Sequence, residues 1–341
     1  MANLAPKLLV FFGDSHVEGG DLGYGLVGSL GTFDPDYPSE AMVEPLQRLL
    51  KDYGSAYPFK ELGWYQGCFS DGLSWPHLLG EWLGLEVMNF SHSGATTCQS
   101  IAVPPGYVGI SSSMGLDGYI FWPRGVAQQI RQASRVLATE QWQDPDTLVI
   151  VGSVGNDVVY SGAAAIGSTL EEAAASPYIS NCKQIVSDLV ALGVNRERII
   201  LTGLQGLECL PGIQSMDFDL EWLCHQQDAI NEVIDALVPL PRWTQEKVFR
   251  SMSRKHSARV KRCLYELMPF TPEELPEKAR LAQLSAADGA AIWFDEYHPS
   301  SMLHHELANA FAEQFLRPRR VDELARAIAS ASEEGDRGEK L

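Results

Sequence analysis

The chain has 341 residues, of which 45% are hydrophobic and 21% are charged, and its formal net charge is −18. This balance is typical of a globular protein with one large α/β domain or two smaller ones. The acidity argues against a nucleic-acid-binding protein, which needs clustered lysines and arginines. It also disfavours steady residence on anionic membranes.

The cysteines and the N-terminus give the next exclusions. Six cysteines are scattered without a Cys-x-x-Cys pair, so a zinc site or a thioredoxin-type site is poorly supported. A chain of this size needs no disulfides for its core, and we expect mostly reduced, buried thiols. Residues 1–6 lack a charged leader and no apolar stretch approaches transmembrane length. We therefore expect a cytoplasmic protein without a stable membrane anchor, or a secreted one if a signal peptide has been removed.

The first predicted strand covers residues 7–12 and ends in Gly13, Asp14 and Ser15. A continuous apolar run is typical of a buried parallel strand. Ligand sites in open α/β sheets lie outside the carboxyl ends of the strands, which places Ser15 as a nucleophile. The alternative is that Asp14 or Ser15 only caps the following helix, which is the commoner role of these residues.

Four more strands and five helices alternate along the rest of the chain. The predicted strands cover residues 85–90, 147–151, 198–203 and 290–294. The predicted helices cover residues 76–83, 125–139, 176–192, 218–238 and 300–316. This alternation predicts a parallel sheet with helices on both faces.

No repeat or linker divides the chain, so we expect a single domain over residues 1–330 and a disordered, charged tail over residues 331–341. Long segments near residues 17–67, 101–124 and 239–276 are interpreted as insertions. The second has the composition of a mobile lid or of a surface loop pinned by aromatic residues. The third is basic and fits an amphipathic helix or a small subdomain, whose charges more often form a solvated face than an anion site.

Polar residues follow several of these strands and should meet at one edge of the sheet. His298 has a carboxylate, Asp295, three residues before it. Asp295 can orient His298, which can then take a proton from Ser15. The backbone N–H groups of Ser15 and Gly94 and the side-chain amide of Asn156 can form an oxyanion hole. Each residue alone is more often structural, but their joint placement at strand ends favours nucleophilic catalysis.

The same segments resemble the sequence blocks of the SGNH hydrolases, also called GDSL-type lipases and esterases, over nearly the whole chain. Gly13-Asp14-Ser15 is similar to the block with the nucleophile, and residues 89–95 to the block with the glycine donor. Residues 154–157 are similar to the Gly-x-Asn-Asp block, and residues 295–299 to the block with the aspartate and histidine.

Two positions depart from these blocks, because Val154 stands in place of a glycine and His16 in place of the name-giving leucine. The resemblance implies a flavodoxin-like three-layer α/β/α sandwich with a central five-stranded parallel sheet. It also implies hydrolysis of a small-molecule, lipid or other acylated ester through an acyl-enzyme, without a metal or other cofactor. An acyltransferase would use the same acyl-enzyme, and a non-catalytic carbohydrate- or lipid-binding protein is the remaining alternative.

Overall fold

The structure, a computed structural model, describes residues 4–17, 70, 72–92, 94–98, 125–152, 155–161, 163–167, 169–215, 219–255, 293 and 298–316. Within these residues one parallel sheet has the strand order β2-β1-β3-β4. The strands are β1 (Leu8–Phe12), β2 (Glu86–Asn89), β3 (Thr147–Val151) and β4 (Ile199–Leu201). The predicted α/β class with a parallel sheet is confirmed, and this strand order is that of flavodoxin-like folds.

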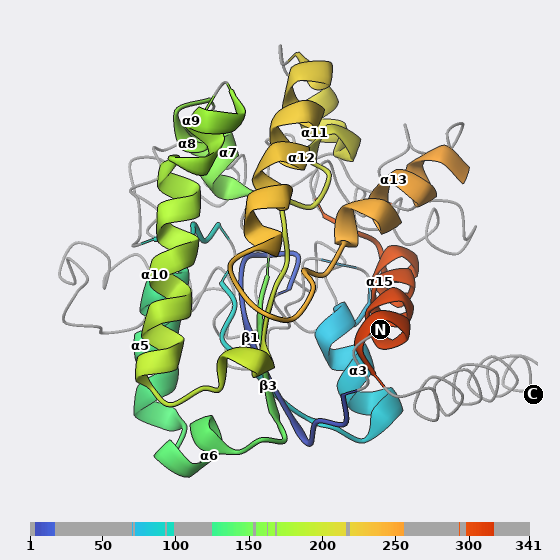
Figure 1. The fold of residues 1–341 in the computed structure, drawn as a ribbon. Coiled ribbons are helices and arrows are strands. Elements are labelled where there is room, and N and C mark those ends of the chain that lie inside the picture. The colour runs from blue at the N-terminus through green and yellow to red at the C-terminus, as the bar shows by residue number, and fades with distance from the viewer. Residues whose placement is uncertain are drawn as a thin grey trace, which may run out of the picture.

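Helices cover both faces of the sheet. Figure 1 shows α5 (Val126–Val136) and α10 (Pro177–Ala191) on one side, and α3 (Trp75–Leu83) and α15 (Ser301–Phe315) on the other. The remaining helices are α6 (Thr139–Gln143), α7 (Asn156–Ser161), α8 (Ala163–Ile166), α9 (Leu170–Ala174), η1 (Arg196–Arg198), η2 (Leu207–Cys209), α11 (Pro211–Ser215), α12 (Leu220–Asp235) and α13 (Gln245–Lys255). None of the helices in the described ranges is long and apolar enough to cross a membrane.

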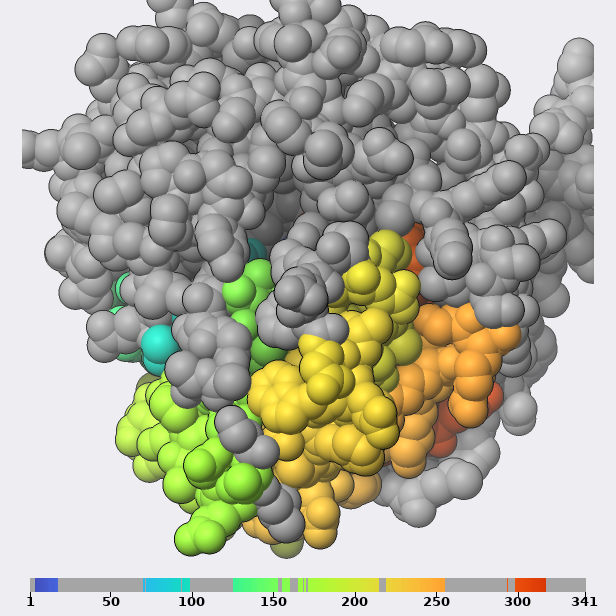
Figure 2. Space-filling model, turned by 90° about the horizontal axis from the view of Figure 1, so that it is seen from above, coloured from blue at the N-terminus to red at the C-terminus, as the bar shows by residue number. Residues whose placement is uncertain are grey.

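Several of the shorter helices gather beyond the carboxyl ends of the strands. In Figure 2, which looks down on this end of the molecule, α8 and α9 (green) lie beside α12 (yellow to orange). Helix α13 (orange) follows next to α12 and packs against α15. These helices enclose the edge of the sheet at which the sequence predicts the site.

The central strands β1 and β3 are buried along their whole length. Strand β1 is an uninterrupted apolar run, and β3 is apolar after its first residue, Thr147, as expected for strands covered on both faces. Successive side chains of β1 point to opposite faces. Phe11 meets the ring of Trp75 in α3 edge-on, with 5.1 Å between ring centroids, whereas Phe12 stacks on Trp142 of α6 at 6.5 Å. Strand β1 therefore joins both helical layers to the sheet.

The predicted elements and the observed ones agree closely in the described ranges. The ends of the first four predicted strands differ from the observed ends by at most two residues. The helix predicted over residues 125–139 stops earlier, because Leu137 is extended and α6 begins at Thr139. The fifth strand, predicted over residues 290–294, lies outside the described residues apart from Trp293, which forms an isolated antiparallel bridge with Pro299.

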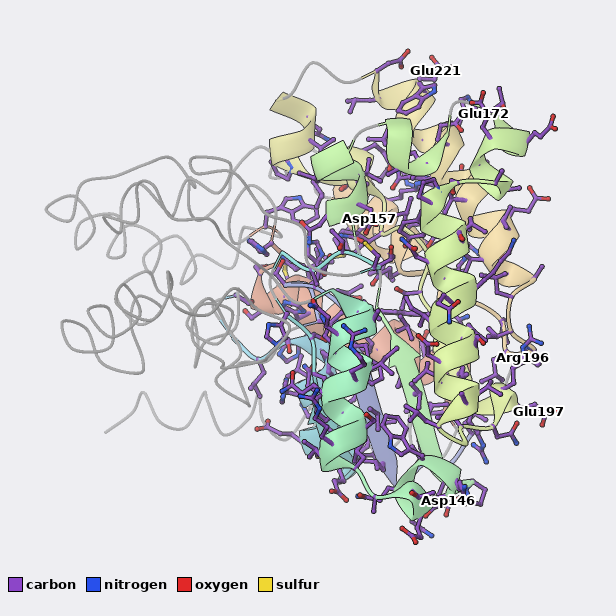
Figure 3. All side chains as sticks on the ribbon, turned by 90° about the vertical axis from the view of Figure 1, so that its left-hand side faces the viewer. Asp146, Asp157, Glu172, Arg196, Glu197 and Glu221 are labelled. Atoms are coloured by element: carbon purple, nitrogen blue, oxygen red, sulfur yellow. The ribbon has the colours of Figure 1, made fainter. Side chains whose placement is uncertain are left out.

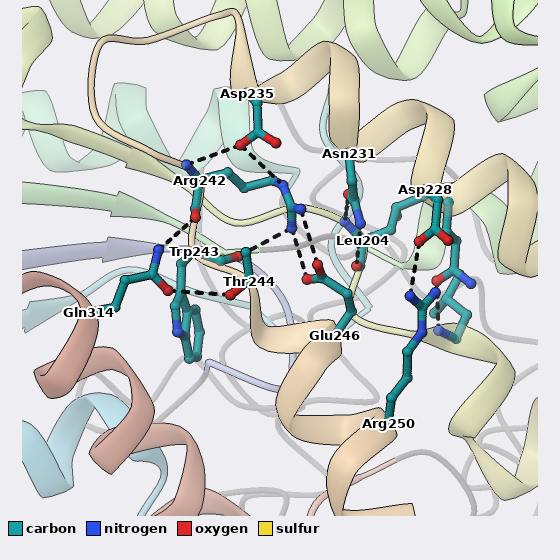
Figure 4. Close-up of polar contacts among 12 residues, drawn as sticks. Leu204, Asp228, Asn231, Asp235, Arg242, Trp243, Thr244, Glu246, Arg250 and Gln314 are labelled. Atoms are coloured by element: carbon teal, nitrogen blue, oxygen red, sulfur yellow. Dashed lines mark hydrogen bonds and ion pairs between the residues drawn. The ribbon is translucent and has the colours of Figure 1, made fainter. Parts of the chain in front are cut away.

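The predicted insertions near residues 17–67 and 101–124 lie outside the described residues except for Val17. The third insertion is described as far as Lys255 and forms α13. One basic residue of this segment, Arg250 of α13, is partly exposed and paired with two carboxylates of the protein. Its guanidinium donates to Glu208 at 2.6 Å and to Asp228 at 3.0 Å, and the latter contact is drawn in Figure 4.

The described cysteines are free thiols, as expected, although only two of them are buried. Cys182 and Cys209 lie in the core, whereas Cys98 and Cys224 are partly exposed. Burial raises the pKa of the Cys209 thiol to about 12, so this cysteine stays protonated at neutral pH.

The ends of β1 and β3 approach each other closely where the two strands end. A Cβ atom at Gly152 would lie 2.5 Å from Cγ2 of Val17 and 3.0 Å from the carbonyl oxygen of Phe12. A Cβ atom at Gly13 would lie 3.1 Å from the same Val17 atom. Glycine at both positions allows this contact, which forms the floor of the site.

We predict that Gly152→Ala destabilises the protein by about 1–3 kcal/mol through overpacking. Denaturant unfolding of Gly152→Ala, Val17→Ala and the double variant tests this. Because Val17→Ala removes the clashing methyl group, the double variant should lose less stability than the sum of the two single losses. Simple additivity would show that this contact does not limit the packing.

Candidate active site

Ser15 and His298 are in direct contact although 283 positions separate them in the chain. The Nε2 atom of His298 lies 2.8 Å from Oγ of Ser15, and each residue is only 8% exposed. This is the hydrogen-bond distance between a serine nucleophile and its base. The structure thus joins the two residues at the carboxyl edge of the sheet.

The turn that carries Ser15 is held by hydrogen bonds from several directions. The Asp14 carboxylate accepts from the His16 N–H at 3.0 Å, and the Asp14 carbonyl accepts from the Val17 N–H at 3.1 Å. At the far end of the turn, Asn89 donates to the Val17 carbonyl at 2.7 Å. Ser15 therefore lies within a tight, buried turn, and Asp14 stabilises that turn as a local cap.

His298 is fixed by the segment that enters α15. Its neighbour Pro299 bridges to Trp293, and the helix begins two residues later at Ser301. A Cβ atom on Gly72 would lie 2.7 Å from the Cβ atom of Ser301. The glycine therefore lets the chain before α3 pack directly on the first residue of α15. One turn further on, the Trp75 N–H donates to Nδ1 of His304 at 3.3 Å.

The two other residues predicted for the oxyanion hole lie beside each other. Gly94 has a left-handed φ of 74°, a conformation that side-chain-bearing residues adopt only with strain. Asn156 is the first residue of α7, and its Nδ2 atom donates to the Ala95 carbonyl at 2.9 Å. Because an amide group has two N–H donors, this bond orients the side chain and leaves a second donor for a ligand.

Asp157 joins the two segments that carry these donors. Its carboxylate accepts from the Thr97 N–H and from the Thr97 hydroxyl, both at 2.8 Å, and Asn181 donates to that hydroxyl at 3.0 Å. Figure 3 shows Asp157 directed into the interior, whereas Glu172, Glu197 and Glu221 lie at the periphery. Burial raises the pKa of Asp157 to about 6, against the opposing effect of the bonds from Thr97.

Hydrogen bonds also join residues 13–17, the turn with the predicted nucleophile (the nucleophile turn), to the segments that carry Gly94 and Asn156 (the oxyanion segments). The His92 N–H donates to the Gly13 carbonyl at 3.0 Å, and the Gly155 N–H donates to the Asp14 carboxylate. The sequence-predicted residues Ser15, Gly94 and Asn156 thus belong to one connected network. Asp295, the predicted partner of His298, lies outside the described residues.

Sequence reasoning missed a residue that contacts the main chain of this turn. Gln129 of α5 is 0% exposed, and its side-chain amide binds both main-chain polar groups of Gly13. A signal for it exists in the sequence. Gln129 lies three residues after Val126 and four before Ala133, so helical spacing places it on the same face as these two apolar residues. A polar residue on such a face has to find a buried partner.

The described residues contain no cluster of three or more His, Cys, Asp or Glu side chains arranged to hold a metal ion. The polar groups at this edge are instead a hydroxyl, an imidazole, amides and two carboxyls. They can accept and donate protons and can bind an oxygen that carries negative charge.

Comparison with known families identifies the chain. The model of the family described as GDSL-like Lipase/Acylhydrolase matches residues 9–311. The chain belongs to this family. Membership in the GDSL-like lipases and acylhydrolases indicates a hydrolase that acts on esters, and the matched range includes every site residue discussed above. A search of curated proteins found no significant match.

The buried Asp14 gives a test of the electrostatics of this GDSL site. Burial raises the pKa of Asp14 to about 7, although the N–H groups of His16 and Gly155 and the nearby His298 favour its ionised form. The unfolded chain should lose this proton near the ordinary value of about 3.9. Between roughly pH 4 and pH 7 the folded protein thus holds a proton that the unfolded chain lacks, so stability falls as pH rises.

We predict that Asp14→Asn loses less stability than the wild type as pH rises from 5 to 8, by about 1.4 kcal/mol for each pH unit below the native pKa of about 7, with the difference levelling off above it. Denaturant unfolding across this range measures the difference. Glu171→Gln, which changes an exposed carboxyl of α9, is the control and should follow the wild type. Equal pH slopes for wild type and Asp14→Asn would contradict the assignment.

Proposed function

We propose that this protein is a serine esterase or lipase that hydrolyses carboxylic esters through an acyl-enzyme on Ser15. The observation that carries the proposal is the contact of 2.8 Å between Oγ of Ser15 and Nε2 of His298. Both groups are buried at the carboxyl edge of a parallel sheet, where ligands of open α/β folds bind. Family membership supports the same class of reaction.

In the proposed first step, Ser15 attacks the carbonyl carbon of the ester while His298 takes the hydroxyl proton. For this, Nε2 of His298 must be unprotonated and its Nδ1 atom must carry the hydrogen. Asp295, three residues earlier in the chain, is proposed to accept from Nδ1 and to stabilise the imidazolium. His298 then protonates the departing alcohol, and a water molecule activated by the same imidazole hydrolyses the acyl-enzyme.

The negative charge that develops on the carbonyl oxygen needs donors that are already in position. The backbone N–H groups of Ser15 and Gly94 and the second amide N–H of Asn156 are proposed for this role. The left-handed backbone at Gly94 and the bond from Asn156 to Ala95 support it, because both fix the donors before a substrate arrives.

The substrate is proposed to be a small-molecule or lipid ester, and its acyl chain length is the property to measure first. We expect that Ser15→Ala lowers kcat by about 10⁴-fold or more, because no other group in the proposed mechanism forms the acyl-enzyme. Hydrolysis of p-nitrophenyl esters from acetyl to palmitoyl by wild type and Ser15→Ala, assayed side by side, tests both points.

Serine-dependent turnover that peaks at short chains would indicate a small closed acyl pocket, and a peak at long chains would indicate an open apolar groove. Turnover by Ser15→Ala at the wild-type rate would refute the proposed nucleophile. Transfer of the acyl group to an added alcohol in preference to water would replace hydrolysis with an acyltransferase reaction on the same serine.

We predict that Asn156→Ala lowers kcat by about 10²–10³-fold while KM changes little, because the lost bond forms mainly in the transition state. Asn181→Ala is the matched control. Asn181 also donates to the oxyanion segment, but through the Thr97 hydroxyl, so its loss should lower kcat by less than about 10-fold. Equal losses in the two variants would mean that Asn156 only supports the fold.

A further inference from the structure

The main-chain N–H and carbonyl of Gly13, the residue after β1, are both bound by a side chain from another layer of the fold. The Gly13 N–H donates to Oε1 of Gln129 at 2.9 Å, and Nε2 of Gln129 donates to the Gly13 carbonyl at 2.8 Å. The partners fix the orientation of this amide, because a backbone N–H only donates and a carbonyl only accepts. Gln129 thus binds Gly13 as a neighbouring strand would.

This pair of hydrogen bonds lies where the pairing of β1 with its neighbours ends, and the Gly13 carbonyl also accepts from the His92 N–H after β2 at 3.0 Å. The last bond between the β1 and β3 segments runs from the Gly152 N–H to the Phe12 carbonyl, one residue before Gly13. Gln129 is fully buried, and an unsatisfied buried amide is strongly unfavourable. The turn that begins at Gly13 can therefore shift only if both bonds to Gln129 break, together with the bond from the His92 N–H to the Gly13 carbonyl.

Ser15 lies between two such amide contacts. Gln129 holds the turn at Gly13, and Asn89 holds it at the Val17 carbonyl. The same helix also binds the oxyanion segment, because the Val126 N–H at the start of α5 donates to the Thr96 carbonyl at 2.9 Å. Helix α5 consequently contacts both the nucleophile turn and the segment that carries Gly94.

We propose that Gln129 is a positioning residue for the nucleophile. Its side-chain amide holds the main-chain N–H and carbonyl of Gly13, so that Ser15 stays within hydrogen-bonding distance of His298. Gln129 acts through Gly13 and does not contact the reacting atoms. This inference rests on the proposed function of Ser15 and adds a residue from outside the sequence blocks of the family.

A matched control exists elsewhere in the fold, as Figure 4 shows. Asn231 of α12 accepts from the Leu204 N–H at 2.7 Å and donates to the Leu204 carbonyl at 3.2 Å, so it binds a main-chain residue beyond β4 in the same way. Asn231 is also buried, at 2% exposure. Its loss should affect stability without moving the nucleophile turn.

The first comparison is between Gln129→Met and Asn231→Leu, which replace each amide by an apolar side chain of similar size. Both variants should unfold at lower denaturant concentration than the wild type. Gln129→Met should also lower kcat by about 10–100-fold with KM nearly unchanged, because small displacements of a nucleophile slow the chemical step. Asn231→Leu should keep kcat within about 3-fold of the wild type.

The second comparison uses Gln129→Glu, which keeps the shape of the side chain. A protonated glutamic acid can accept from the Gly13 N–H and donate to the Gly13 carbonyl, whereas an ionised one places an anion against that carbonyl. Burial raises the pKa of a carboxyl group without a cationic partner. The ratio of kcat between Gln129→Glu and wild type should therefore be near one at pH 5 and fall about 10-fold or more by pH 8.

The assay uses the p-nitrophenyl ester that the wild type hydrolyses fastest, with product quantified after quenching and rates normalised to folded protein. Groups present in both enzymes, such as Asp14 and Asp157, cancel in the ratio. A flat ratio, or equal kcat losses in the Gln129 and Asn231 variants, overturns the positioning role. The Ser15→Ala assay separates this result from a failure of the proposed nucleophile, because it does not depend on Gln129.

Discussion

The site depends on the abrupt change from apolar to polar residues where β1 ends. Five buried apolar side chains are followed directly by Gly13 and then by Asp14, Ser15 and His16, which are also buried. Polar groups at such depth are unfavourable unless each finds a hydrogen-bond partner. The partners of this turn come from the ends of β2 and β3, from helix α5 and, for the Ser15 hydroxyl, from His298 before α15. The hydrogen bonds that satisfy the buried polar groups of this turn therefore also position the serine.

Two buried carboxyls determine the electrostatics around this turn. Burial raises the pKa of Asp14 and of Asp157 toward neutrality, and each also accepts N–H groups from a neighbouring segment. A carboxyl that is protonated near neutral pH adds no negative charge beside the place where an oxyanion would form. At neutral pH this applies to Asp14, whose pKa is about 7, whereas Asp157, with a pKa of about 6, is mostly ionised and is stabilised by the two hydrogen bonds from Thr97. The large negative charge of the chain is carried elsewhere, as the peripheral carboxylates in Figure 3 illustrate.

Periodicity and strand-end reasoning predicted the parts of the fold that follow from local pattern. Strand β1 and all of β3 after Thr147 are apolar, and such short runs, alternating with helices along the chain, are typical of a parallel sheet with two covered faces. The contact between Ser15 and His298 was predictable because both follow the ends of predicted strands. The pairing of Thr202 with Trp243 beyond β4 was not, because a single bridge leaves no repeating pattern in a sequence.

The amide contacts were the least predictable part of the site. Gln129 binds the main-chain N–H and carbonyl of Gly13, which is 116 positions away in the chain. Asn231 binds those of Leu204, which is 27 positions away. No spacing rule connects such residues, and their only trace is a polar side chain on an inward-facing stripe. Buried amides of this kind become visible once the topology shows which backbone groups have left the sheet and still need partners.

Helix α5 provides a common support for both halves of the site. Gln129 binds the nucleophile turn and the Val126 N–H binds the oxyanion segment, within four residues of one rigid helix. In acyl transfer the carbonyl carbon and its oxygen lie between these two segments, so their separation must be held to a fraction of an ångström. A single helix that contacts both achieves this better than two independent loops, because motions of the helix carry both segments together. The relative placement of the proposed nucleophile and oxyanion donors thus depends on a helix of the core.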